Sequence, residues 1–300
     1  MSAIGGVLTN LIIVLALAPL FDGVLRKLKA LIHSRQGPPI TQSYTDLLKL
    51  LGKEDIQSGG GPIFRLAPIM VLGAMLVAVL FTPLGGKPPL GGSGDTIVWI
   101  YVISLAAVAI MLGAFASGNP WAMEGASREM MMLLSVEPIV IAALVTAGVK
   151  AGTLSMGGII DWQFAHGASM SMIFAGIAFF LALQANLCKL PFDIVEAESE
   201  IVEGPIIEYS GPRLALYKMA FYVRQLVFPL VLVSIFIPWP MVSLYPLSVL
   251  VTLVKVLVVL LVVGLIECVN PRLRIDQSMN YMSRVLFVAL AGLVFAAIGV

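Results

Sequence analysis

The chain has 300 residues, of which 59% are hydrophobic and 12% are charged, and its formal net charge is +1. A typical soluble domain has about 25% charged residues, and the mean hydropathy here is +1.01. These values exclude a soluble globular protein, a disordered chain and a protein that binds nucleic acid. They predict a polytopic protein of the lipid bilayer.

Eight stretches of the chain are long and apolar enough to cross a membrane, which takes about 20 residues. They are Ile4–Phe21, Ile63–Phe81, Thr96–Ala116, Arg128–Val149, Ser171–Cys188, Leu214–Ile237, Val242–Glu267 and Tyr281–Val300. We predict an all-α fold with eight transmembrane helices in a single integral membrane domain, residues 1–300. The first stretch has no basic residue ahead of it, so we expect a retained span and not a cleaved signal. The linker Pro238–Pro240 is so short that the sixth and seventh spans should be antiparallel neighbours.

The basic residues decide how these spans are oriented, because cytoplasmic loops carry an excess of Lys and Arg. With the N-terminus outside, Lys87 and Lys150 are the only basic residues in outer loops. Three more basic residues lie deep inside spans, and the rest of the 18 lie in inner loops or at their flanks. We therefore expect a multi-pass protein of the cell (inner or plasma) membrane, with both termini outside and the large loops cytoplasmic.

The first inner loop, residues 22–62, contains a segment with an amphipathic pattern. In Gln42–Glu54, leucines alternate with Asp46, Lys49 and Lys53, and Thr41 or Ser43 is placed to cap a helix. The pattern predicts an amphipathic cytoplasmic helix that lies on the membrane or under a partner protein. A plain polar surface loop is the alternative.

The second inner loop, residues 189–213, is unusually acidic. It has six acids and no base between its first and last acid: Asp193, Glu196, Glu198, Glu200, Glu203 and Glu208. If the segment is helical, four of these acids share one stripe, with Ile194, Val195, Ile201 and Val202 on the buried side. Like charges at this spacing need screening or shared protons with coupled pKa values. A solvated acidic loop is the alternative.

Besides the arginines at the ends of spans (Arg65, Arg128 and Arg284), six charged residues fall inside the predicted spans, where each costs about 2.5–3.5 kcal/mol on insertion scales. They are Glu129, Glu137, Lys218, Arg224, Lys255 and Glu267. We expect them to form a proton-conducting string from the acidic loop toward the bilayer centre; interhelical salt bridges that only hold the bundle together are the alternative. The chain has two Cys and two His, too few for a metal or iron–sulfur centre of its own.

Three blocks of sequence resemble signatures of one family. The first is Pro191–Gly204, the second is Gln42–Glu54, and the third is Pro271–Gln277. The family is the membrane subunit of respiratory complex I that docks the peripheral arm, with its relatives in membrane-bound NiFe hydrogenases. The resemblance covers nearly the whole chain, and eight spans is the number typical of the family.

Several positions look like the hydrogenase branch of this family. Gly125–Glu129 and Val136–Pro138 resemble that branch, and Leu216–Gln225 has basic residues where complex I subunits usually have a glutamate–tyrosine pair. Glu267 stands where complex I tends to have an arginine. These differences argue against a quinone-binding tunnel.

The resemblance implies a non-redox membrane anchor and proton-coupling subunit of an energy-converting hydrogenase or formate hydrogenlyase. The implied partners are the hydrogenase large and small subunits, which hold the NiFe centre and iron–sulfur clusters, and antiporter-like membrane subunits. This chain would hold no cofactor and no catalytic residue. The residues expected to dock the partners are Arg35, Asp46, Lys49, Lys53, Arg272, Arg274 and Asp276.

The expected proton pathway consists of the six loop acids and the six ionisable residues in the spans. On this interpretation, Glu137→Gln should stop ion translocation and spare hydrogenase activity with artificial donors. Three alternatives remain: a quinone-site subunit of a complex I type NADH dehydrogenase, a purely structural anchor, and a self-sufficient secondary transporter. The last predicts internal repeats, and the sequence contains no convincing repeat.

Overall fold

The computed structural model describes residues 3–56, 61–92, 94–240, 242 and 244–299, without the side chains of residues 3–4 and 198–199. Every regular element in this part of the chain is helical. The elements are α1 (Ala3–Ile32), α2 (Gln42–Leu51), α3 (Pro62–Phe81), α4 (Asp95–Ser117), α5 (Pro120–Ala151), α6 (Met156–His166), α7 (Met170–Asn186), α8 (Glu198–Ile201), the 3-10 helix η1 (Gly204–Ile206), α9 (Gly211–Phe236), α10 (Tyr245–Val269) and α11 (Ile275–Ile298).

Seven of these helices are long and apolar enough to cross a membrane, which confirms seven of the eight predicted spans and a multi-pass membrane protein. The remaining predicted span, Ser171–Cys188, corresponds to α7, an apolar helix of 17 residues. At 1.5 Å per residue α7 is about 26 Å long, at the lower limit for a span. It lies beside α5 and α11 along its length.

Two helices extend beyond the limits predicted from hydropathy. The first span was predicted to end at Phe21, but α1 continues to Ile32 and includes Arg26 and Lys29. The fourth was predicted to start at Arg128, but α5 starts at Pro120. Charged residues lower the local hydropathy, yet a helix continues through them where their side chains reach ion-pair partners or water.

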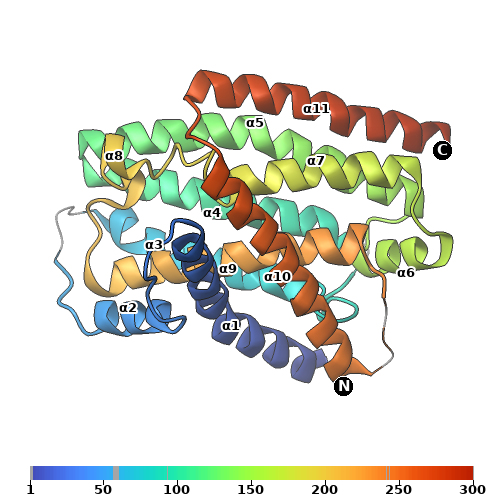
Figure 1. The fold of residues 1–300 in the computed structure, drawn as a ribbon, viewed down its shortest axis with the longest axis horizontal. Helices are drawn as coiled ribbons and strands as arrows, with labels where there is room; N and C mark the ends of the chain where they lie inside the picture. Colours follow the sequence, from blue (N-terminus) through green and yellow to red (C-terminus); the bar gives the residue numbers. More distant parts are fainter. Residues whose placement is uncertain (1–2, 57–60, 93, 241, 243, 300) are drawn as a thin grey trace.

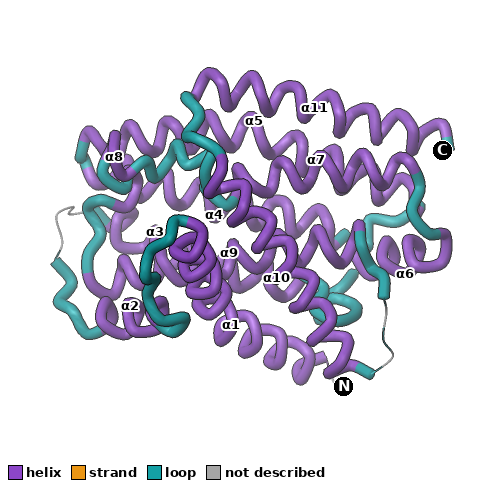
Figure 2. The backbone as a smooth tube through the Cα atoms, in the orientation of Figure 1, coloured by secondary structure: helices purple, strands orange, loops and turns teal. Residues whose placement is uncertain are grey.

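The helices pack in two groups around α9. Helices α5, α7 and α11 contact one another, and α3 contacts α4 and α9. Helices α1 and α10 cross this bundle obliquely (Figure 1) and contact α9 and each other. The predicted neighbours α9 and α10 are thus in contact, although they cross rather than align. Figure 2 shows that loops join the helices mainly at the two ends of the bundle.

Burial follows this arrangement. Most side chains of α9 are buried, including Tyr217 and Phe228, which are at most 1% exposed. Helix α10 exposes Leu250, Val254 and Val258 instead. Because lipid tails solvate apolar side chains, exposed leucine and valine are expected on the membrane-facing side of a span. The two chain ends lie at one end of the bundle, and α2 and α8 lie at the other (Figure 1).

Candidate functional site: ion pairs at one end of the bundle and a buried ion cluster

The acidic loop folds against the end of the bundle where α2 and α8 lie. Helix η1 packs on α5 at Gly125, where an added Cβ would lie 2.6 Å from the Cδ of Pro205. Glycine at this position therefore permits the close approach that seats the loop. The buried residues Ile194, Val195 and Ile201 anchor it further, whereas Val202, predicted to be buried with them, is 57% exposed.

The single acidic helix that would align four carboxylates on one stripe does not form. Only the four residues of α8 are α-helical, and Val202, Glu203 and Gly204 have positive φ angles of 50°, 67° and 51°. Four like charges on one helical stripe would repel one another. The observed turns send the acids toward separate cations instead.

Three of the acids form ion pairs with cations from three different parts of the fold. The pairs and their closest N–O distances are Asp193–Arg272 at 2.7 Å, Glu200–Arg128 at 2.7 Å and Glu203–Lys218 at 3.4 Å. The hydrogen bond from Arg128 lowers the pKa of Glu200. These cations come from the α10–α11 connection, α5 and α9, so the loop links three parts of the bundle.

Two further acids of the predicted set, Glu208 and Glu198, are outside these pairs, and the sixth, Glu196, is described below with the cluster to which it belongs. Glu208 accepts a hydrogen bond from the side chain of Asn119, which caps the N-terminus of α5. The side chain of Glu198 lies outside the described residues.

Glu129, Cys188, Glu196 and Arg224 line one small cavity deeper in the bundle, and we call them the buried ion cluster, although Cys188 and Glu196 are themselves only partly buried. Glu129 is 7% exposed and Arg224 is 9% exposed. Arg224 donates a hydrogen bond to the Cys188 Sγ at 3.3 Å, and its guanidinium carbon lies 5.0 Å from the ring centroid of Phe221. Glu129 is attracted electrostatically by Arg224 and repelled by Glu196. One cation therefore serves two carboxylates and a thiol.

Burial controls protonation at the loop side of this cluster. It raises the pKa of Glu196, against the opposing effect of Lys218 and Arg224. It raises the pKa of Cys188 to about 12, although Arg224 favours the thiolate. Cys188 is therefore a neutral thiol at physiological pH. In the described part of the chain, no group of three or more His, Cys, Asp or Glu side chains is placed to hold a metal ion.

Two small cavities adjoin the cluster. One, of about 40 Å³, is lined by Glu129, Cys188 and Arg224 and continues along α5 past Met132 to Val136. The other, of about 10 Å³, is lined by Glu129, Cys188 and Arg224 together with the loop acids Glu196 and Glu203. A volume of about 10–15 Å³ holds one water molecule, so the larger cavity has room for water beside Glu129. Glu129, Cys188 and Arg224 line both cavities and therefore lie between the acidic loop and the face of α5 at Val136.

The remaining predicted pathway residues lie apart from this cluster. Glu137 contacts Ser104 of α4 in a hydrogen bond between their side chains. Glu267 pairs with Lys29 of α1 at 2.5 Å. Lys255 donates to two backbone carbonyls just beyond the C-terminal end of α9. The described structure therefore groups Glu129, Glu196, Glu203, Lys218 and Arg224, and separates the other three from them.

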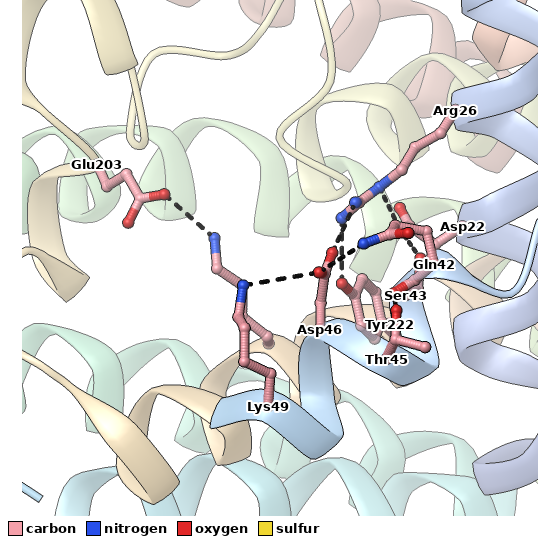
Figure 3. A network of polar contacts seen from close by, with 10 residues as sticks. Asp22, Arg26, Gln42, Ser43, Thr45, Asp46, Lys49, Glu203 and Tyr222 are labelled. Atoms are coloured by element: carbon pink, nitrogen blue, oxygen red, sulfur yellow. Dashed lines mark hydrogen bonds and ion pairs between the residues drawn. The ribbon is translucent and has the colours of Figure 1, made fainter. Parts of the chain in front are cut away.

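Sequence reasoning missed a second polar network, formed by α1, α2 and α9, which we call the α1–α2 network. Asp22 is 5% exposed, accepts a hydrogen bond from Ser43 at 2.9 Å and pairs with Arg26 at 2.8 Å. Arg26 also contacts Asp46 at 3.3 Å and the hydroxyl of Tyr222 at 3.2 Å. Figure 3 shows these side chains converging. The spacing of four residues between Asp22 and Arg26 was the available signal.

The predicted helix over residues 42–54 forms as α2, which ends at Leu51. Thr41 occupies its N-cap position but makes no side-chain cap hydrogen bond, and Ser43 bonds Asp22 instead. Of the expected docking residues, Asp46 and Arg272 are turned to partners within the chain. The others are exposed: Arg35, Lys49, Lys53, Arg274 and Asp276.

Known proteins are similar to this chain in sequence and in fold. A family model described as NADH dehydrogenase matches residues 5–297. Formate hydrogenlyase subunit 4 of Escherichia coli (strain K12) is 34% identical over 90% of this chain and 91% of its own length. Hydrogenase-4 component C of the same organism is 35% identical over 87% and 85%. A chain of the membrane-bound sulfane sulfur reductase, an archaeal respiratory membrane complex, superposes with a TM-score of 0.89 and 30% identity, covering 99% of this chain and 100% of that one.

Proposed function

The chain belongs to the NADH dehydrogenase family, and from this premise we propose that it is the membrane anchor and proton-coupling subunit of an energy-converting NiFe hydrogenase or formate hydrogenlyase. The similarity to a formate hydrogenlyase subunit and to a hydrogenase-4 component supports this branch of the family. Redox chemistry would take place at a NiFe centre and iron–sulfur clusters in partner subunits.

The partners would dock on the end of the bundle that carries α2 and the acidic loop. We assign this end, with loops 22–62 and 189–213, to the cytoplasm, and both termini to the opposite side of the inner membrane. The exposed docking residues Lys49, Lys53 and Arg274 offer charge to a partner. Leu48 and Leu51 of α2 are 69% and 54% exposed and offer apolar area. The hydrogenase large and small subunits would cover this surface, and antiporter-like subunits would lie beside the bundle.

Coupling would begin at the loop acids, whose charge responds to a docked redox partner. A change of charge near Glu203 or Glu196 alters how far Lys218 and Arg224 compensate the carboxylates, because Lys218 pairs with Glu203, and Arg224 lines the small cavity with both loop acids. Glu129 would then take up or release a proton through water in the larger cavity. From there the proton has to pass the apolar stretch at Met132 and Val136 before reaching the level of Glu137.

One observation carries the coupling proposal: Glu129 is a buried acid that faces a cavity and shares its cation with a loop acid. To test the identity of the complex, we would tag the C-terminus, purify the chain with its associated subunits in mild detergent, and measure bound nickel and hydrogen evolution from reduced viologen. We expect nickel near one atom per complex together with hydrogen evolution.

Other outcomes would favour other members of the family. Quinone reductase activity without nickel would indicate the quinone-site subunit of a complex I type enzyme, and the hydrogenase assignment would be wrong. If the complex contains nickel and evolves hydrogen but does not translocate ions in proteoliposomes, the chain is a structural anchor and the proposed coupling role is wrong.

A further inference from the structure

Two cavities adjoin at the C-terminal end of α9, at the end of the bundle opposite the acidic loop. One has a volume of about 390 Å³ and an apolar lining from α7, α9 and α10 that includes Ile173, Ile177 and Val262. The other has a volume of about 140 Å³ and a more polar lining that includes Ser248 and Lys255. Neither takes part in the proton-coupling role proposed above.

The two cavities are adjacent because the same elements line both of them. Ile237 lines the apolar cavity and Pro238, the next residue, lines the polar one. On α10, Ser248, Thr252 and Lys255 face the polar cavity, and Val259 and Val262 face the apolar cavity. These positions are spaced by three or four residues, so they form one stripe of the helix that changes from polar to apolar along its length.

Lys255 brings an uncompensated positive charge to the polar cavity. Its ammonium group donates to the carbonyls of Ile237 and Pro238, each at 3.1 Å. An ammonium has three N–H donors, so one remains after these two bonds. Among the described residues no acid acts on Lys255. The two carbonyls satisfy part of the ammonium group, and its third donor and its missing carboxylate partner leave a place for an anion from outside the chain.

Gln163 of α6 brings a buried amide to the apolar cavity. It is 1% exposed, it lines the cavity, and neither its Nε2 nor its Oε1 has a hydrogen-bond partner within the described residues. An unsatisfied buried amide is costly, and the cost disappears when a ligand supplies the partner. Ile160 of the same helix lines the polar cavity, which places α6 across both cavities.

We propose that the two cavities bind one anionic phospholipid. Its phosphate would accept hydrogen bonds from Lys255 and the Ser248 hydroxyl, an ester carbonyl would accept from Gln163, and one acyl chain would fill the apolar cavity. The phosphate, the ester carbonyl and the acyl chain would thus follow the order of the residues that line the cavities, from Lys255 and Ser248 to Gln163 and then to apolar side chains. A free phosphate ion would leave the apolar cavity and the Gln163 amide unused.

The test compares the wild-type complex with Lys255→Met and Gln163→Leu. Each complex would be purified with its associated subunits, washed with delipidating detergent and examined by native mass spectrometry. We expect the wild type to retain one phospholipid, and Lys255→Met to need about tenfold more phosphatidylglycerol in mixed micelles for the same occupancy. Gln163→Leu should weaken retention less. Lys150→Met, which removes a cation of α5 outside both cavities, should behave as wild type.

Two further measurements separate the possible occupants. Inorganic phosphate should not raise the thermal midpoint of the delipidated complex, whereas phosphatidylglycerol should; a response to phosphate alone would overturn the lipid proposal. A photoreactive residue at position 177 should cross-link to lipid, and cross-linking mainly to a partner polypeptide would overturn it. Loss of all phospholipid from the wild-type complex would also contradict the proposal. So would retention of phospholipid by both variants at the level of the wild type.

Discussion

Two buried carboxylates of this protein, Asp22 and Glu129, show opposite solutions to the same problem. Both are at most 7% exposed, and both lie on apolar helices near an arginine. Asp22 pairs with Arg26 at 2.8 Å and accepts a hydrogen bond from Ser43. Glu129 is acted on by Arg224, but that guanidinium donates to Cys188 and also acts on Glu196.

The difference lies in what surrounds each carboxylate. The α1–α2 network supplies Asp22 with donors from its own helix and from α2. Glu129 faces a cavity of about 40 Å³ with room for water. A carboxylate with fixed donors keeps its charge and holds helices together, whereas one that faces water and shares its cation can exchange a proton. We therefore assign a structural role to Asp22 and a coupling role to Glu129.

The largest expected effect comes from Glu129→Gln. Because glutamine keeps the size of the side chain and removes the exchangeable proton, we expect ion translocation in proteoliposomes to be abolished. Hydrogen evolution from reduced viologen and the amount of complex in the membrane should stay near wild type. Translocation would be followed by a pH-sensitive dye during turnover.

Two further variants on α5 serve as a control and as a second test of the proton path. Glu124→Gln changes an exposed acid of the same helix, paired with Arg128, and should pump normally. Glu137→Gln tests the acid that lies apart from the cluster, beside Ser104; a coupling path through α5 predicts that it also loses translocation. Full pumping by Glu129→Gln would place the proton path elsewhere.

Asp22→Ala should have the next largest effect, and on stability instead of coupling. The substitution leaves Arg26 and Ser43 without their shared acceptor. Hydrogen bonds to charged groups contribute about 1.5–3 kcal/mol, so we expect the detergent-solubilised complex to lose about 2 kcal/mol and its thermal midpoint to fall. Translocation per assembled complex should be unchanged. A variant with normal stability and lost pumping would reverse the roles assigned to Asp22 and Glu129.

Hydropathy predicted most of the fold because lipid imposes one requirement on every span, a long apolar helix. It misplaced the ends of α1 and α5, since ion pairs such as Lys29–Glu267 let helices continue through charged residues. The fifth predicted span corresponds to α7, whose 17 residues are at the lower limit of length for a span. Helix ends depend on partners from distant parts of the chain, and a local window of sequence does not contain them.

The sequence showed which charged residues of the site lie inside spans or in the acidic loop, but it did not show which of them come into contact. Glu129, Glu196 and Arg224 come together because α5, α9 and the acidic loop pack at Gly125 and along α9. Lys255 was placed in the same string only because it lies inside a span, yet it reaches the opposite end of α9. Asp22 was interpreted as a loop residue because the first span appeared to end at Phe21. Pairings across the sequence follow from tertiary packing, which the spacing of charges along one helix does not predict.

Glu196 and Glu200 extend the comparison to two acids of the loop, with pH effects of opposite sign. Burial raises the folded pKa of Glu196 above its ordinary value of 4.5, so its contribution is lost as pH rises through the folded pKa. Arg128 lowers the pKa of Glu200, so its contribution is lost as pH falls. Thermal midpoints from pH 4 to 8 should show that Glu196→Gln flattens the loss at high pH. Glu200→Gln should change the loss of stability at low pH only slightly, by less than about 0.5 kcal/mol in the free energy of unfolding, because the Glu200 side chain is 52% exposed.

The smallest expected effect concerns Cys188, which lines the same cavity as Glu129 and reports whether that cavity opens. Burial raises the pKa of this thiol to about 12, so at pH 8 its reactive thiolate is much scarcer than that of an unfolded cysteine. We therefore expect slow alkylation by a small maleimide in the resting complex and fast alkylation in urea, both read by peptide mass spectrometry. If protons reach Glu129 through water, alkylation should accelerate several-fold during turnover, and this acceleration should be absent from Glu129→Gln. Equal rates at rest and during turnover would mean that the cavity stays closed, and Glu129 would then resemble Asp22 in role as well as in burial.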